Sequence, residues 1–364
     1  MKKAKRVFAL ILALAMALSL LAGCGGSGGS GGSDDTGSEK KTIRVGTLPF
    51  TGSVPVAYAI EKGYFEEAGL DVEQYEFATG APMNEAFAAG QLDIAVIGLA
   101  GVISMSTGNA VCIYETNTAS GGNGIFVRPD SPLAAVSGQC EGYPNLLGST
   151  DLLRGITIIG NLGTSSQLQT ILYLEHFGLT QDDINFVNMD TGADYQAFKS
   201  GEGDAVSLMT PYTYNAADDG YVQVCSFEDA ADYVIPDTML ATKSFMESDR
   251  DTAKLFLEVY LKAVDELNAD DDLMFNTSKE YFAACGREYG DDYVKRDLET
   301  RFLIDADYMS GENYCFGSGM WEVAKLFTES GKIEESNLHN VIDCLDTSLI
   351  QEITGLQVAV ETGD

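Results

Sequence analysis

Hydrophobic residues in the body of the chain recur in short runs that alternate with longer amphipathic stretches. Residues 42–49 and 70–78 have the pattern of strands, and residues 54–69 between them repeat apolar positions at helical spacing. The same order continues through a helix at 81–90 and a fully apolar strand at 92–99. Short apolar strands that alternate with helices are typical of βαβ units around a parallel sheet. The sequence therefore predicts an α/β fold.

A second series of the same kind follows, and a loop-rich stretch at residues 130–151 separates it from the first. Its predicted strands lie at 155–161, 184–189, 204–209 and 222–227, and its helices at 165–178, 194–201 and 211–219. Beyond Ser244 the chain is helical, and residues 251–269 form its clearest amphipathic helix. The pattern predicts two α/β units and a helical C-terminal region, without a short internal repeat.

The N-terminus has a basic segment, residues 1–6, followed by an unbroken run of apolar and small residues at 8–22. This run is shorter than the ~20 apolar residues that a membrane-spanning helix needs, and it is typical of a signal peptide. It ends in LAGC at residues 21–24, which resembles the lipobox of bacterial lipoproteins. The alternative is an ordinary signal peptide with a chance cysteine. We expect residues 1–23 to be a lipoprotein signal peptide and Cys24 to carry the lipid.

The segment after this cysteine contains almost no apolar side chains. It begins GGSGGSGGS at residues 25–33 and continues with polar and charged residues. A sequence of this kind behaves as a flexible coil. We therefore expect residues 24–41 to be a linker between a lipid anchor and the folded body.

Composition and charge exclude some classes of protein. The chain has 364 residues, of which 45% are hydrophobic and 21% are charged, which excludes a disordered acidic tail protein. Its 55 acidic and 22 basic residues give a formal net charge of -33. Because such a charge repels phosphate backbones, we expect no nucleic-acid partner.

Six cysteines follow Cys24 in the sequence. Their even number permits disulfides outside the cytoplasm, but several lie in apolar strand-like runs, where buried free thiols are common, so both states stay open. They are Cys112, Cys140, Cys225, Cys285, Cys315 and Cys344. The chain has no C-x-x-C pair and two histidines, so we expect neither a metal nor another cofactor.

Several segments together resemble a known family. The stretch at 43–73, which includes EKGYFEEAGLDV, resembles the opening of the taurine, sulfonate and nitrate substrate-binding proteins of ABC importers, a group that also binds thiamine precursors. Further matches keep the family order at 79–98, 152–179, 184–208 and 320–333. The resemblance implies the type II periplasmic-binding fold, in which two α/β lobes are joined by two crossover strands with a ligand cleft between them.

By analogy with that family, the two crossings lie near residues 124–128 and 237–242. Lobe one then consists of residues 42–128 and 237–364, and lobe two of residues 129–236. The stretch at 138–150 is longer than usual for the family, and the sequence assigns it no role.

Ligands of open parallel sheets bind at the carboxyl ends of the strands, where helix N-termini can hold an anion. We expect the ligand to contact residues at these strand ends. The candidates are Phe50, Thr51, Gly52, Gly80, Ala81, Leu99, Asn117, Thr164, Ser165, Ser166, Thr210 and Tyr212.

Two of these assignments have structural alternatives. The run Thr164-Ser165-Ser166-Gln167 also fits a capping box that only closes the helix start, and capping and ligand contact can hold together. An aromatic residue such as Phe50 often packs in the core instead of facing a cleft.

The strand-end segments contain neither Lys nor Arg. A small hydrated anion such as nitrate usually requires a cation, whereas an organic body gains from apolar burial. The sequence therefore favours an organic sulfonate, a carboxylate or a thiamine-precursor type of nutrient.

We expect a monomeric, lipid-anchored binding protein without catalytic residues on the extracytoplasmic face of a bacterial membrane. Its partners would be a permease and separate ATPase subunits, because the chain has no phosphate-binding loop. The main alternative is an enzyme on the same fold, of the thiamine-pyrimidine synthesis or desulfination type. The Cys-rich motif and histidine of the pyrimidine enzymes are absent, and His176 and His339 have the context of packing or surface residues. A surface adhesin is a third alternative.

Overall fold

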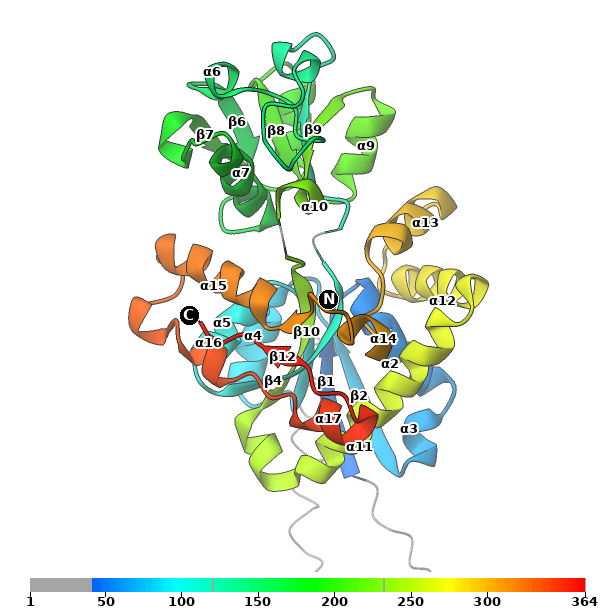
Figure 1. Ribbon diagram of the computed structural model, residues 1–364. Coiled ribbons are helices and arrows are strands. Elements are labelled where there is room, and N and C mark those ends of the chain that lie inside the picture. Colours follow the sequence, from blue (N-terminus) through cyan, green and yellow to red (C-terminus); the bar gives the residue numbers. More distant parts are fainter. Residues whose placement is uncertain (1–40, 120, 232, 364) are drawn as a thin grey trace, which may run out of the picture. The chain divides into compact units, whose positions relative to one another are not determined.

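The computed structural model describes residues 41–119, 121–231 and 233–363 (Figure 1). The predicted signal peptide, Cys24 and almost all of the predicted linker lie outside these residues. Within the described ranges, no helix combines the length and the apolar character needed to cross a membrane.

The first sheet has five strands in the order β2-β1-β3-β10-β4. They are β1 (Lys41–Thr47), β2 (Leu70–Glu76), β3 (Ile94–Ile97), β4 (Ala110–Thr118) and β10 (Pro236–Thr242). Strand β1 is parallel to β2 and β3, as the alternating pattern predicts. Strand β10 arrives from far along the chain and runs antiparallel between β3 and β4.

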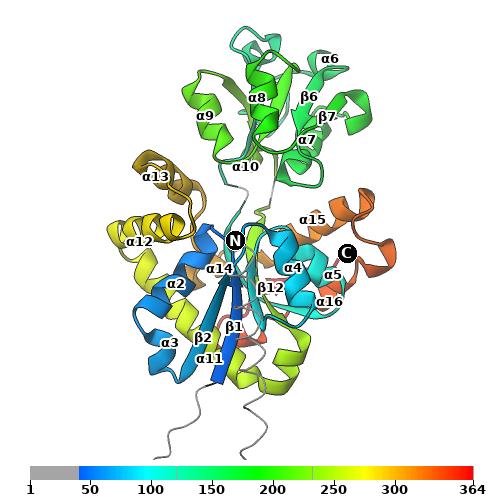
Figure 2. The ribbon, with the colours of Figure 1, turned by 180° about the vertical axis from the view of Figure 1, so that it is seen from behind.

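Helices cover both faces of this sheet and form most of the C-terminal region. In Figure 2, α2, α3 and α11 lie on one side of β1 and β2, and α4, α5 and α16 lie on the other. The helices of this lobe are α2 (Val54–Glu61), α3 (Tyr64–Glu67), α4 (Gly80–Ala88), α5 (Gly101–Ser106), α11 (Lys243–Asn268), α12 (Asp271–Ala284), α13 (Asp291–Thr300), α14 (Ala306–Met309), α15 (Ser318–Glu329), α16 (Asn340–Asp343) and α17 (Ser348–Thr354), with short 3-10 turns at Thr51–Ser53 and Glu335–Asn337. Two short parallel strands, β11 (Cys315–Phe316) and β12 (Ala359–Val360), pair with each other.

The amphipathic helix predicted at 251–269 is confirmed as the greater part of α11. Its apolar stripe, which includes Phe256, Tyr260 and Val264, is fully buried in the core of lobe one. The helix begins earlier than the sequence suggested, because the Thr242 hydroxyl caps its first turn and a kink at Asp249 joins two helical segments.

The second sheet also has five strands, in the order β7-β6-β8-β5-β9. They are β5 (Gly124–Val127), β6 (Thr157–Gly160), β7 (Asn185–Asn188), β8 (Ala205–Leu208) and β9 (Val222–Ser226). The helices of this lobe are α6 (Thr150–Leu153), α7 (Ser165–His176), α8 (Ala193–Lys199), α9 (Tyr212–Asp218) and α10 (Phe227–Ala230), with 3-10 turns at Pro132–Ala135 and Gln181–Asp183. The two faces of this sheet bury separate apolar clusters, so lobe two has its own core. The long stretch at 138–150 belongs to this lobe and buries Leu146 and Cys140.

The chain passes from lobe one to lobe two between β4 and β5 and returns between α10 and β10. The two connections lie side by side, since the Ala119 amide donates to the Ile235 carbonyl at 2.7 Å. The predicted arrangement of two α/β lobes with two crossings is confirmed. The predicted first boundary placed residues 124–128 in lobe one, but β5 pairs with β8 and β9 and so belongs to the second sheet. The return boundary lies at the start of β10, next to the predicted position.

Candidate ligand-binding site

A pocket of about 650 Å³ is lined by residues of both lobes, at the carboxyl ends of β2, β3, β6 and β8. Lobe one contributes Ala81, Asn84, Glu85, Leu99, Ala100, Ile103, Phe327 and Lys332, and lobe two contributes Gly163, Thr164, Ser165 and Met209. We call this the interlobe pocket. Four of the predicted ligand-binding residues line it: Ala81, Leu99, Thr164 and Ser165.

The start of α7 forms the lobe-two wall of this pocket. The Thr164 hydroxyl accepts a hydrogen bond from the Ser166 amide at 3.2 Å, and the Gln167 side chain accepts one from the Gly163 amide at 2.7 Å. The run therefore does close the helix start, although Gln167 bonds one residue earlier than in the usual capping box. Ser165 is 4% exposed, and its hydroxyl accepts from the Asn123 side chain at 3.1 Å. The segment therefore caps the helix and also lines the pocket, through Thr164 and Ser165.

Ser166 lies away from the interlobe pocket. Its side chain is fully buried, and its hydroxyl donates to the Ser207 carbonyl at 2.7 Å and accepts from the Asn161 amide at 3.2 Å. These bonds fasten α7 to β8 and to the end of β6. The structure therefore gives Ser166 a position in the interior of lobe two, beside the candidate site but outside it.

Lys332 is the one lysine or arginine among the residues that line the interlobe pocket. It follows α15 in lobe one, and its Nζ lies 3.3 Å from the Gly163 carbonyl and 4.8 Å from the centre of the Phe327 ring. Gly163 has φ of 68°, and a Cβ there would lie 1.8 Å from this Nζ. Lys332 is not at a strand end, where the sequence predicted the ligand contacts, but it lies within the family-like stretch at 320–333.

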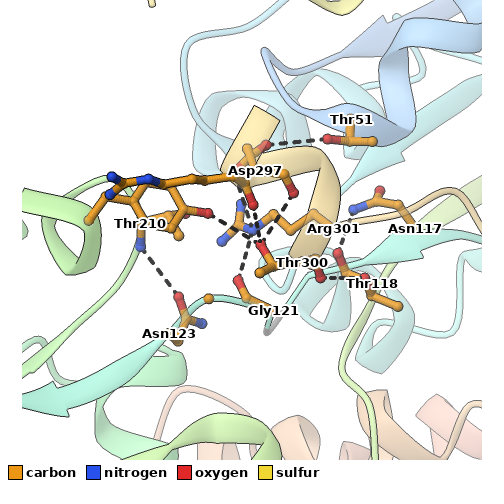
Figure 3. Close-up of polar contacts among 12 residues, drawn as sticks. Thr51, Asn117, Thr118, Gly121, Asn123, Thr210, Asp297, Thr300 and Arg301 are labelled. Carbon is orange, nitrogen blue, oxygen red and sulfur yellow. Dashed lines mark hydrogen bonds and ion pairs between the residues drawn. The ribbon is translucent and has the colours of Figure 1, made fainter. Parts of the chain in front are cut away.

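The predicted residues Thr51 and Asn117 lie in a separate buried polar cluster (Figure 3), and the buried Gly52 packs beside them. The Thr51 hydroxyl donates to Asp297 at 3.5 Å, and the Asn117 side chain donates to Asp237 at 3.0 Å. Gly52 is required for this packing, because a Cβ there would lie 2.3 Å from the Asn117 side-chain oxygen.

Two buried carboxyl groups and one arginine dominate the charge of this cluster. Arg301 donates to the Gly121 carbonyl at 3.3 Å, and its Nε lies 3.8 Å from Asp297 (Figure 3). Burial raises the pKa of Asp237 to about 6 and also raises the pKa of Asp297, while the Arg301 charge offsets part of both shifts. No sequence signal indicated Arg301, because this residue follows α13 and lies far along the chain from the segment between β4 and β5 that it contacts.

Lobe two contacts this cluster through Tyr214 on α9. The Tyr214 and Thr300 hydroxyls lie 3.2 Å apart, and Arg296 on α13 forms an ion pair with Asp218 at 3.0 Å. Helix α13 therefore joins the two lobes near the connecting segments.

Phe50, Gly80, Thr210 and Tyr212, the remaining predicted residues, do not line the interlobe pocket. The Phe50 ring is half-buried and packs against the lobe-one core. Gly80 begins α4, where a Cβ would lie 2.5 Å from the Ala100 Cβ. The Thr210 amide donates to the Asn123 side chain at 3.4 Å, and the Tyr212 ring packs against Tyr195 at 5.8 Å.

Groups that could act as nucleophiles or metal ligands are held in other roles. Among the described residues, no group of three or more His, Cys, Asp or Glu could hold a metal ion. His176 contacts the Ala230 carbonyl at 2.8 Å and its ring packs at a tilt against Tyr143, and His339 lies at the surface beside Asp343. The six described cysteines are free thiols, and burial raises the pKa of each.

Comparison with known proteins agrees with this architecture. Residues 36–274 match the NMT1-like family, and the chain belongs to it. A protein of Brachyspira hyodysenteriae named "Putative ABC transporter periplasmic binding protein" is 28% identical over 341 residues, which cover 93% of this chain and 96% of the relative.

Two solved structures share the fold. A protein of Methylobacillus flagellatus named "putative sulfonate ABC transporter, periplasmic sulfonate-binding protein SsuA" superposes with a TM-score of 0.69 at 18% identity, covering 89% of this chain and 99% of that one. The aliphatic sulphonate binding protein SsuA from Escherichia coli gives a TM-score of 0.62 at 17% identity, covering 81% of this chain and 94% of that one. The predicted family resemblance and the periplasmic-binding fold are therefore confirmed.

Proposed function

We propose that this chain is the solute-binding component of an ABC importer and that it holds a small organic anion in the interlobe pocket. The observation that carries the proposal is the convergence of the α7 N-terminus and the Lys332 ammonium on one pocket lined by both lobes. The names of the Brachyspira relative and of the two SsuA structures support the same class.

The chemistry of the pocket favours a ligand with an anionic end and an apolar body. Helix N-termini present unpaired amides and a positive dipole end to an anion, and Lys332 adds a formal charge. The remaining wall is largely apolar, with Leu99, Ile103, Met209 and Phe327. A volume of about 650 Å³ accommodates an organic sulfonate, a carboxylate or a thiamine-precursor type of molecule, each larger than nitrate.

The mechanism that follows is binding without chemical change. A ligand that contacts both Ser165 in lobe two and Lys332 in lobe one gains most when the lobes are close, so it favours a closed arrangement. The closed form would then dock on a permease whose separate ATPase subunits supply the energy.

A thermal-shift screen of the purified protein against sulfonates, carboxylates and thiamine precursors tests this proposal. A ligand at 100 times its dissociation constant stabilises a protein by ~2.7 kcal/mol, which such a screen detects easily. Hits are then incubated with the protein and analysed by mass spectrometry. Recovery of the unchanged ligand supports a binder, whereas a converted product would establish the rival enzyme class.

We also propose that Cys24 anchors the mature chain to the outer face of the membrane through a lipid. The LAGC sequence at residues 21–24 and the Gly/Ser-rich linker motivate this step. The Cys24→Ala variant should appear in the soluble fraction, and its retention in washed membranes would contradict the anchor.

A further inference from the structure

A second pocket, of about 620 Å³, lies in lobe one beside the returning connection between the lobes. It shares no lining residue with the interlobe pocket. Its walls come from β4, from the segment that leads into β10, and from residues around α14 and β11. They are Glu115, Tyr233, Val234, Pro236, Ile304, Asp307, Tyr308, Gly311, Glu312, Asn313, Tyr314, Cys315 and Ser318. We call it the lobe-one pocket.

Carboxylates and tyrosine rings give the lobe-one pocket a chemistry opposite to that of the interlobe pocket. Glu115, Asp307 and Glu312 line it, and none of its lining residues is Lys or Arg. The rings of Tyr308 and Tyr314 meet edge to face with centroids 5.8 Å apart. An anion would therefore be repelled here, whereas a cation would meet both negative charge and electron-rich tyrosine rings.

Glu115 is the most buried of the three acids, at 3% exposure. Its carboxylate is held at both oxygens, since the Tyr314 hydroxyl donates at 2.6 Å and the Gly317 amide donates at 2.9 Å. Burial raises the pKa of Glu115 to about 7, so Glu115 acts mainly as a hydrogen-bonded acid of the pocket wall, and the negative charge comes chiefly from the exposed Asp307 and Glu312.

Tyr233 adds an unused polar group to the same wall. Its hydroxyl is buried and has no hydrogen-bond partner among the described residues. Such orphan groups are uncommon in folded proteins, and a ligand with N–H or O–H groups could satisfy this one.

We propose that the lobe-one pocket binds an organic ammonium cation. Ammonium groups gain from contact with tyrosine ring faces, and the Asp307 and Glu312 carboxylates supply the counter-charge. The volume is large enough for a molecule with an organic body rather than a bare metal ion, and the aromatic walls favour such a body. This site is separate from the anion site of the proposed function and does not depend on it.

Titration calorimetry of the purified full-length chain with choline, at constant ionic strength, tests the proposal. We expect saturable binding of one choline per chain. Tyr308→Leu should weaken it about tenfold, the loss expected for a desolvated cation–π contact. The surface variant Asp307→Asn/Glu312→Gln should weaken it about fivefold.

Two controls separate a built site from general attraction to an acidic protein. Asp130→Asn/Glu141→Gln removes the same charge from exposed positions of lobe two and should leave choline affinity unchanged. Lys332→Met, in the interlobe pocket, should leave it unchanged as well. Thermal melts show whether each variant is folded.

The proposal is overturned if choline gives no saturable heat at millimolar concentration. It is also overturned if the lobe-two control weakens binding as much as the pocket variants, or if Lys332→Met abolishes it. In the last case choline would be a ligand of the interlobe pocket.

Discussion

The Nζ of Lys332 lies 3.3 Å from the carbonyl oxygen of Gly163, so a lobe-one residue that follows α15 contacts the segment that leads into α7, the lobe-two wall of the pocket. The two residues are 169 positions apart in the sequence. A carbonyl is a weak partner for an ammonium group, and a ligand anion seated at the α7 N-terminus would be a stronger one.

Replacing Lys332 by Met should therefore weaken binding of an anionic ligand about 10- to 100-fold. This range corresponds to the ~1.5–3 kcal/mol that a hydrogen bond to a charged group contributes. Calorimetry with a hit from the thermal-shift screen measures the loss. Lys325→Met is the matched control, because that ammonium pairs with Glu322 on the surface of α15 and should leave the affinity unchanged. Equal affinities of the wild type and Lys332→Met would remove this residue from the site.

Adjacent serines at the start of α7 should respond differently to replacement by Ala. Ser165→Ala should weaken ligand binding, by ~0.5–1.5 kcal/mol for a neutral ligand group and ~1.5–3 kcal/mol for a charged one. Ser166→Ala should instead lower the free energy of unfolding by ~1–3 kcal/mol and leave affinity unchanged, because it strips a buried bond from the Ser207 carbonyl. Urea unfolding and calorimetry on both variants separate the two effects. If Ser165→Ala binds the ligand as tightly as the wild type, the Ser165 hydroxyl only accepts the hydrogen bond from Asn123 and does not contact the ligand.

The raised pKa of Glu115 should make the free energy of unfolding depend on pH. Burial raises its pKa from 4.5 to about 7, so the folded state binds a proton more tightly than the unfolded state. The stability from this proton is therefore fully present below pH 4.5 and is lost as the pH rises towards 7. Relative to Glu115→Gln, the wild type should lose ~3 kcal/mol of unfolding free energy between pH 4.5 and 7.5.

Urea unfolding at several pH values measures this difference, and the comparison cancels the contributions of all other acids. Parallel pH curves for the two proteins would show that Glu115 titrates normally.

Removing the Arg301 charge should destabilise the buried polar cluster. Arg301→Met leaves Asp297 and Asp237 without their nearby cation, and loss of one partner of a buried pair costs ~3–5 kcal/mol. Adding Asp297→Asn should restore part of this loss, since the uncompensated charge is then gone. The exposed Arg287→Met is the control, with no change expected. A double variant no more stable than Arg301→Met alone would mean that packing, not charge, explains the effect.

Local periodicity was sufficient to predict β1, β2 and β3, the strands β6 to β9, the helices at α2 to α4 and α7 to α9, and the greater part of α11. It gave no prediction for α5, β4 or β5. It could not place β10, because insertion of a distant strand between β3 and β4 is a tertiary event without a local signal. The same limit applies to β5, whose four residues suit either sheet and whose partners alone decide the lobe.

The candidate site was predictable where it depends on strand ends, as at Ala81, Leu99, Thr164 and Ser165. The site was not predictable where the direction of a side chain decides whether the residue faces the pocket. Successive residues on a helix point about 100° apart, so Ser165 faces the pocket while Ser166 faces the lobe interior. Lys332 and Arg301 reach their positions through the packing of C-terminal helices on both lobes, which no short motif encodes.

The position of β10 in the first sheet also constrains the order in which the chain can fold. The chain is synthesised from its N-terminus, so all five strands of the second sheet are available once residue 226 has emerged. Lobe one at that point still lacks β10, an internal strand of its sheet. Until residues 236–242 emerge, the fully apolar β3 has one edge unpaired. Such an edge is prone to pairing with other chains. Lobe two, although inserted into lobe one, can therefore be complete first, and the interval before β10 arrives is when a nascent chain most needs protection by a chaperone.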